Sequence, residues 1–215
     1  MVLWTIWYRR NQIRVKNEDY PISQVVLNAF QALEDFKRAN HDAPTQIATI
    51  SSPQTRWSPP PSNYLKVNFD GATFKDIGKA GLGVVIRGSH GQVIASPSEQ
   101  VNPPVSSDMV EAQTAARVMS FVVEIGCPSF ILEGDSESVI KTLNSEEDNL
   151  SPFEHILTAA KKITDTTSIS LSHVPKVGNS VIHNLTKHAR DVNGYLVWME
   201  DVPLHLYSVL LADSG

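Results

Sequence analysis

Residues 65–73 read LKVNFDGAT, and this short stretch decides the fold. Apolar and polar residues alternate from Leu65 to Asp70 with a period of two, which is typical of a β-strand. Asp70 lies on the face opposite the apolar residues, and Gly71 and Ala72 follow it directly. The stretch therefore predicts a strand that presents a carboxylate near its end.

Two further acidic residues follow in an informative order. Glu111 lies early in a helix-like run, MVEAQTAARVMSFVVEIG, at residues 109–126. Asp135 closes an apolar run, FILEGDS, at residues 130–136, which is typical of a buried strand. Carboxylates on two strand ends and one helix are the ligands that two hard divalent ions need beside a phosphodiester. The set predicts a metal site for cleavage of a nucleic-acid backbone.

The surrounding pattern predicts an α/β fold. After the first strand we expect, in chain order, strands at 80–88 and 92–101 joined as a hairpin, a helix at 107–125, a strand at 129–135, a helix at 136–144 capped by Ser136, a helix at 153–164, a strand at 168–174 and a helix at 180–192 capped by Asn179. This order gives a five-stranded mixed sheet: an antiparallel meander of three strands, then two strands with crossover helices, with helices on its faces. In such a sheet Asp70 and Asp135 lie on neighbouring strands, and the helix that carries Glu111 packs across them.

The chain divides before this pattern begins. Residues 1–41 contain one helix-like segment and are expected to form an N-terminal helical appendage. Residues 42–62 are rich in Pro and Ser and predict a stiff, extended linker. Residues 63–200 are expected to form the domain, and residues 201–215 a C-terminal tail.

Composition limits the classes of protein that fit. The chain has 215 residues, of which 41% are hydrophobic and 19% charged, as in ordinary globular proteins. The single cysteine, Cys127, suits a reducing compartment, and no apolar run reaches the roughly 20 residues that span a bilayer. We expect an intracellular monomer, in the nucleus or cytoplasm rather than secreted, that does not bind membranes. The formal net charge of −5 argues against binding nucleic acid through bulk charge.

The motifs together resemble a known family. NFDGA at 68–72, the Glu-bearing helix, EGDS at 133–136 and SHVP at 172–175 resemble ribonuclease H type 1. More narrowly, they resemble the ribonuclease H-like domains of plant non-LTR retrotransposons and the plant genes derived from them. The resemblance covers about residues 63–196. It implies a hydrolase that cuts the RNA strand of an RNA–DNA hybrid endonucleolytically, with two Mg²⁺ ions or with Mn²⁺ as a substitute.

The resemblance also assigns the metal ligands. Asp70, Glu111 and Asp135 match three of the family's four acidic positions. The fourth position falls on His183, ten residues after His173. Imidazole is a poorer ligand for Mg²⁺ than carboxylate and suits Mn²⁺ better, so we expect His183 to weaken the activity.

Four more residues receive roles from the resemblance. His173 matches a catalytic histidine that helps the product leave or moves a proton. Asn179 matches a polar position in the same loop and is assigned to the substrate. The backbone at Gly71 and Ala72 would approach the RNA strand, whose 2′-hydroxyl distinguishes it from DNA.

Other functional classes fit less well. Integrases and transposases of related fold use Asp, Asp and then a Glu on a late helix, whereas here Glu111 comes second. Exonucleases of the superfamily carry Asp-x-Glu in the first strand, whereas here Asp70 is followed by Gly and Ala. A non-catalytic module that binds nucleic acid or a protein stays open, because His183 and the net charge of −5 favour it.

Overall fold

The computed structural model describes residues 21, 57–127, 129–145, 152–164 and 168–214. The predicted N-terminal helix and most of the predicted linker lie outside these residues. The chain divides into two compact units, one of residues 1–52 with 121–128 and one of residues 53–120 with 129–215. In the first unit the described residues are Pro21 and 121–127, where the helix at 107–124 ends before Gly126 at a φ of 69°. The second unit carries the sheet.

A six-stranded mixed sheet forms the centre of the second unit, in the order β5-β4-β1-β2-β3-β6. β1 (Leu65–Phe74), β2 (Lys79–Arg87) and β3 (Val93–Val101) make the predicted antiparallel meander. β4 (Ser129–Gly134) pairs parallel with β1, and β5 (Ser168–His173) pairs parallel with β4. The prediction of a mixed α/β sheet with helices on its faces is confirmed.

The prediction of five strands was wrong by one. β6 (Tyr195–Met199) pairs antiparallel with β3 at the edge of the sheet. Its sequence, YLVWM, is apolar throughout and does not alternate, so its periodicity did not distinguish it from other apolar runs. The turn before it is made at Gly194, whose φ is 83°. That glycine was the local signal for a new strand.

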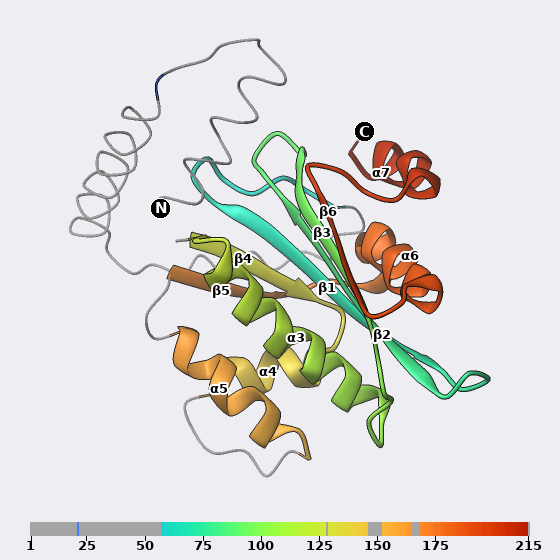
Figure 1. Cartoon of the computed structure of the whole chain (residues 1–215). Helices are drawn as coiled ribbons and strands as arrows, with labels where there is room; N and C mark the ends of the chain where they lie inside the picture. Colours follow the sequence, from blue (N-terminus) through green and yellow to red (C-terminus); the bar gives the residue numbers. More distant parts are fainter. Residues whose placement is uncertain (1–20, 22–56, 128, 146–151, 165–167, 215) are drawn as a thin grey trace. The chain divides into compact units, whose positions relative to one another are not determined.

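The helices cover the two faces of the sheet separately (Figure 1). α3 (Ser107–Glu124), α4 (Glu137–Asn144) and α5 (Glu154–Thr164) lie on one face. α6 (Ser180–His188) and α7 (Tyr207–Ser214) lie on the other. Short 3₁₀ segments η1 (Lys176–Asn179), η2 (Ala189–Asp191) and η3 (Leu204–Leu206) flank them. None of the described helices is both long and apolar enough to cross a bilayer.

The two predicted helix caps turn out differently. Ser136 caps α4 as expected, because its Oγ accepts a hydrogen bond from the backbone N–H of Val139. Asn179 precedes α6, but its side chain makes no capping hydrogen bond, so that prediction was wrong. Its Nδ2 donates instead to the carbonyl of Phe69 in β1 at 3.1 Å. The Asn179 side chain is therefore bonded to the sheet and not to the backbone of the helix that follows it.

α6 packs unusually close to the sheet. A Cβ atom added to Gly83 in β2 would lie 2.4 Å from Thr186 Oγ1, so only glycine leaves room for the helix. An apolar cluster fills the same side of the sheet and joins β2, β3, α6 and the C-terminal segment: Val85, Val93, Val181, Ile182, Leu185, Val202 and Leu206. The helix is therefore held in a fixed position over β1 and β2.

Residues on both sides of the predicted 63–200 domain pack on Arg87 of β2. Arg87 is 1% exposed, and its Nη1 lies 2.7 Å from Asp213 Oδ2 in α7. The ring of Trp57 stacks on the guanidinium, with its centroid 3.7 Å from Cζ. Trp57 precedes the predicted boundary at 63, and Asp213 lies in the segment predicted as a tail. The domain limits themselves stay predictions.

Replacing Asp213 by Asn should lower the free energy of unfolding by about 3 kcal/mol, because it leaves the Arg87 guanidinium buried without its counter-charge. Urea unfolding measures the change. The matched control is Glu137→Gln, which breaks a pair with Lys141 of similar length, 2.8 Å, whose side chains are 63% and 73% exposed. That variant should change stability by less than about 0.5 kcal/mol. Equal effects in the two variants would contradict a stabilising role for the buried pair.

Candidate metal centre

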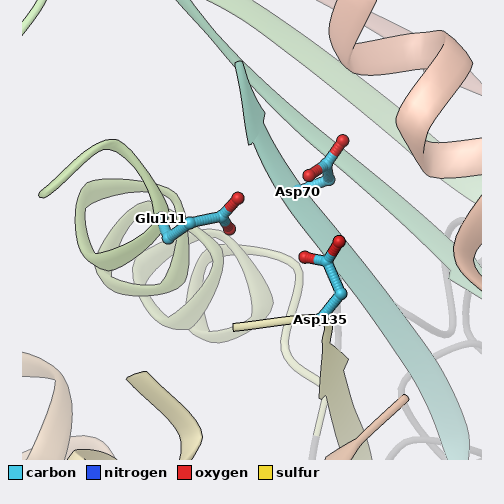
Figure 2. Close-up of side chains that lie close together, drawn as sticks. All are labelled: Asp70, Glu111 and Asp135. Atoms are coloured by element: carbon cyan, nitrogen blue, oxygen red, sulfur yellow. The ribbon is translucent and has the colours of Figure 1, made fainter. Parts of the chain in front are cut away.

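Three carboxylates from three elements meet at one end of the second unit. Asp70 belongs to β1, Glu111 to the first turns of α3, and Asp135 directly follows β4. Figure 2 shows the three side chains pointing toward one another. One oxygen from each lies within 4.8 Å of the other two. Within the described residues, this is the group of three or more acidic, His or Cys side chains close enough to share a metal ion.

The sheet register explains why the two aspartates meet. β1 and β4 run parallel, with Asn68 opposite Glu133 as the last paired positions. Continuing that register by two residues places Asp70 opposite Asp135. The predicted convergence of these residues on neighbouring strands is therefore confirmed.

Gly71 brings the third carboxylate to the other two. A Cβ atom at this position would lie 2.8 Å from Val110 Cγ1 and 3.1 Å from the backbone N of Glu111. Only glycine lets the first turns of α3 approach β1 so closely. The Gly71 N–H then donates to Glu111 Oε1 at 3.1 Å and orients the carboxylate toward Asp70.

The electrostatics of the cluster are unfavourable without a cation. Burial raises the pKa of Glu111 to about 9, with repulsion from Asp70 and Asp135 adding to it. Burial also raises the pKa of Asp135, helped by Asp70 and opposed by the charge of Lys176. The second oxygen of Glu111, Oε2, is buried without a hydrogen-bond partner. A positive charge placed between the three side chains would relieve each of these strains.

These residues fit a hard divalent ion. Carboxylate oxygens are the preferred ligands of Mg²⁺ and Mn²⁺. With metal–oxygen distances of about 2.1 Å, two ligands of one ion lie up to roughly 4 Å apart, so a small inward shift of oxygens that lie within 4.8 Å of one another would allow them to share an ion. Asp70, Glu111 and Asp135 would hold such an ion, and the unpartnered Glu111 Oε2 would become a ligand.

α6 contacts the cluster from the other face of the sheet. His183 Nδ1 lies 3.0 Å from Asp70 Oδ2. Thr186 Oγ1 lies 3.2 Å from the Asp70 carbonyl oxygen and 2.8 Å from the Ile182 carbonyl oxygen, which share its one hydrogen. The Asp70 side chain is 4% exposed and the His183 side chain 27%. His183 therefore touches the first carboxylate, at the edge of the cluster that is open to solvent.

His173, the last residue of β5, and Lys176, the first residue of η1, also act on the site. His173 is exposed, with its Nε2 3.2 Å from the carbonyl oxygen of Asp135. Lys176 acts at longer range, since its charge lowers the pKa of Asp135. Sequence reasoning missed Lys176, which occupies one of the three positions between SHVP and Asn179. Its signal was a single basic residue directly after the SHVP motif, which itself matched a site segment.

The remaining predicted residues lie beside the cluster. Ala72 continues β1 and pairs with Gly81. Asn179 is 2% exposed and is hydrogen-bonded to Asn68 and to the Phe69 carbonyl. The predicted contacts of Gly71, Ala72 and Asn179 with an RNA strand stay predictions.

A family model described as reverse transcriptase-like matches residues 68–189 of the chain. The matched segment begins at the strand of Asp70 and ends after α6. It includes Glu111, Asp135 and His183, and it excludes β6 and α7. No curated protein matches the sequence significantly.

Several solved structures share the fold. RNase H1 from the halophilic archaeon Halobacterium salinarum aligns with a TM-score of 0.54 at 23% identity, over 60% of this chain and 98% of that one. The N-terminal RNase H domain of a Mycobacterium tuberculosis protein aligns with a TM-score of 0.53 at 19% identity, over 60% of this chain and 94% of that one. An RNase H1 of compost origin, solved in complex with an RNA/DNA hybrid, aligns with a TM-score of 0.53 at 18% identity, over 59% of this chain and 96% of that one. The predicted ribonuclease H-like fold is confirmed.

Replacing Glu111 by Gln should stabilise the metal-free protein. The pKa of Glu111 is about 9 in the folded protein and near 4.5 in the unfolded chain. Ionisation of Glu111 therefore lowers the free energy of unfolding at every pH above about 4.5. The loss increases as the pH rises toward 9. The amide has no proton to lose, so the variant's advantage should grow with pH and reach at least about 1 kcal/mol at neutral pH.

Urea unfolding in a chelator at about pH 5, 7 and 8 measures this advantage. Adding Mn²⁺ should then stabilise the parent more than the variant, because binding to the folded state shifts the equilibrium. The control is Asp108→Asn, an exposed carboxylate in the same helical turn. A Glu111→Gln variant that is less stable than the parent at every pH would contradict the repulsion.

Proposed function

Because this chain belongs to the reverse transcriptase-like family, whose model matches more than half of it, we propose that it is an RNA–DNA hybrid ribonuclease of the ribonuclease H type 1 class. The observation that carries the proposal is the convergence of Asp70, Glu111 and Asp135 within 4.8 Å, with one buried Glu111 oxygen unpartnered. The reaction is endonucleolytic hydrolysis of the RNA strand. Water attacks phosphorus, the bond to the 3′ oxygen breaks, and a 5′-phosphate and a 3′-hydroxyl result.

Each residue of the site has a distinct task in this reaction. Two Mg²⁺ ions, or Mn²⁺ as a substitute, would supply the charge that activates water and stabilises the leaving 3′ oxygen. Asp70 lies between the other two carboxylates and His183, so it is the ligand best placed to be shared. Glu111 and Asp135 complete the acidic set from the two sides. His173, exposed at the rim, would take up a proton or help the cut product leave.

The substrate follows from the same site. The compost RNase H1 that shares this fold was solved with an RNA/DNA hybrid, which supports a hybrid as the substrate here. Gly71 and Ala72 would face the RNA strand, where the 2′-hydroxyl separates RNA from DNA. Asn179 would act on the substrate through the loop that it anchors, since its own side chain is buried.

The origin of the domain belongs to the proposal as well. NFDGA at 68–72 after a Pro- and Ser-rich stretch at 42–62 supports kinship with plant non-LTR retrotransposon domains. The division into an appendage, a linker and a domain at 63–200 is proposed on the same sequence pattern.

A second candidate is a non-catalytic module that binds nucleic acid or a protein partner. One observation favours it: His183, not a carboxylate, lies 3.0 Å from Asp70. Cleavage assays separate the two candidates, because the module binds a hybrid and leaves it intact in every metal.

Asp70→Asn should reduce cleavage of the RNA strand in a labelled RNA–DNA hybrid by at least about 100-fold, since it removes the shared metal ligand. The assay measures initial rates in Mg²⁺ and in Mn²⁺ and maps the 5′-phosphate ends. Asp191→Asn, an exposed aspartate beyond α6, is the control and should cleave like the parent. Equal rates for Asp70→Asn and the parent would exclude Asp70 as a ligand.

His183→Asp should raise Mg²⁺-dependent cleavage by about tenfold, which corresponds to about 1.4 kcal/mol of the barrier. The change adds an oxygen ligand and one negative charge beside Asp70, and Mg²⁺ prefers both. The parent should be faster in Mn²⁺ than in Mg²⁺, and the variant should lose that preference. Initial rates of both proteins in each metal test this. An unchanged or lower Mg²⁺ rate would favour the non-catalytic module.

A further inference from the structure

A layer of buried polar side chains lies one step along the strands from the three carboxylates. Its five members are at most 3% exposed and come from four elements: Lys66, Asn68, Arg87, Glu133 and Asn179. We call these residues the polar layer. Two ion pairs balance its charges, one of 2.8 Å between Lys66 and Glu133 and the 2.7 Å pair between Arg87 and Asp213. The layer is therefore neutral although it is buried.

Asn68 uses its full hydrogen-bonding capacity inside the layer. Its Oδ1 accepts from Trp57 Nε1 at 3.2 Å and from Arg87 Nη2 at 3.3 Å. Its Nδ2 donates to Glu133 Oε2 at 3.1 Å and to Asn179 Oδ1 at 3.2 Å. A carboxamide has two donor hydrogens and two acceptor lone pairs, so only one orientation satisfies all four partners.

The bond between Asn68 and Glu133 ties together the strands of two site residues. Asn68 precedes Asp70 by two positions in β1, and Glu133 precedes Asp135 by two positions in β4. Alternate residues of a strand share one face, so the pair Asn68 and Glu133 lies in line with the pair Asp70 and Asp135. The hydrogen bond fixes the lateral offset of β1 and β4 directly below the carboxylates.

The bond between Asn68 and Asn179 ties in the helix. Asn179 precedes His183 by four positions, about one helical turn. Its Nδ2 donates to the Phe69 carbonyl at 3.1 Å. The residue just before α6 is thereby bonded to β1 next to the residue that carries the first carboxylate.

Stability alone does not account for this layer. Apolar side chains of similar size stabilise a core at least as well as buried ion pairs and amides do. Arg87 Nε in the layer is buried without a hydrogen-bond partner among the described residues, whereas all four hydrogen bonds of Asn68 are made in one arrangement. Such a residue selects one alignment of the elements that it joins. Metal sites require ligand positions to be accurate within about 0.5 Å.

We propose that the polar layer, with Asn68 at its centre, is a positioning device that sets the spacing of Asp70, Asp135 and His183 for metal binding. This inference rests on the proposed function of the same site. Asn68 acts through β4 and α6 and touches neither metal nor substrate.

The first test is Asn68→Asp, which keeps the shape of the side chain. The new carboxylate still accepts from Trp57 and Arg87, but it faces Glu133 and the Asn179 oxygen without a hydrogen to donate. The affinity for Mn²⁺, measured by calorimetry, should fall about tenfold, and so should kcat. The KM for the hybrid should stay unchanged.

The second test is rescue by Glu133→Gln in the Asn68→Asp background. The introduced amide donates to the introduced carboxylate, its oxygen still accepts from Lys66, and the layer becomes neutral again. Mn²⁺ affinity should recover by at least about threefold, with the remainder lost through Asn179. A loss of affinity that persists in the double variant, where both the charge balance and the hydrogen bond are restored, would show that this bond does not set the affinity and would overturn the proposal.

Asn179→Ala provides a variant that adds no charge, and it decides the matter if Asn68→Asp does not fold. Positioning predicts weaker Mn²⁺ binding, whereas a raised KM with the parent's Mn²⁺ affinity would assign Asn179 to the substrate alone and overturn its place in the layer. The control is Ser96→Ala, which removes a buried hydrogen bond of 2.6 Å to the Asp201 carbonyl, between β3 and the residues after β6. It should lower stability and leave Mn²⁺ affinity unchanged.

The outcomes separate this inference from the proposed function. A parent that binds Mn²⁺ but does not cleave a hybrid refutes the ribonuclease, and the affinities of the variants still decide the role of the layer. A parent that binds no metal refutes both. Folded Asn68→Asp protein with the parent's affinity and kcat overturns the positioning role alone.

Discussion

Repulsion between three carboxyl groups, one buried and two partly buried, is the constraint on which this structure depends. Their oxygens lie within 4.8 Å of one another, and Glu111 has a pKa of about 9 as a result of burial and of its two neighbours. Such a cluster is costly to assemble at neutral pH, because Glu111 must take up a proton or a cation must offset the negative charges. The scaffold must hold the three groups together against this cost. The elements around the site are arranged to do this.

The two faces of the sheet hold the cluster in different ways. On one face α3 approaches β1 through Gly71, and a backbone N–H holds Glu111 in place. On the other face α6 approaches β2 through Gly83, and Asn179, directly before the helix, donates to the Phe69 carbonyl of β1. Both approaches need glycine because a Cβ atom would meet the helix. The two glycines, Gly71 and Gly83, are thus as important to the site as the carboxylates themselves.

Much of this could be predicted from the sequence, and the failures have a common physical cause. The alternation before Asp70 and the order of the acidic residues were sufficient for the fold and the cluster. The cap assigned to Asn179 failed because its partner, the Phe69 carbonyl, lies 110 residues away in the chain. Arg87 is buried because Asp213, 126 residues away, neutralises it. Local periodicity carries no information on such distant partners.

His183 shows how the metal-free and metal-bound states make opposite demands on the same residue. A fourth carboxylate beside Asp70 would bind Mg²⁺ well, but it would add to a repulsion that already raises the pKa of Glu111 and Asp135. An imidazole at 3.0 Å from Asp70 avoids that repulsion and gives Asp70 a hydrogen-bond partner. At the proposed metal centre the same exchange would leave one oxygen ligand fewer for Mg²⁺. The imidazole would therefore make the metal-free cluster easier to hold together and the proposed site harder to fill with Mg²⁺.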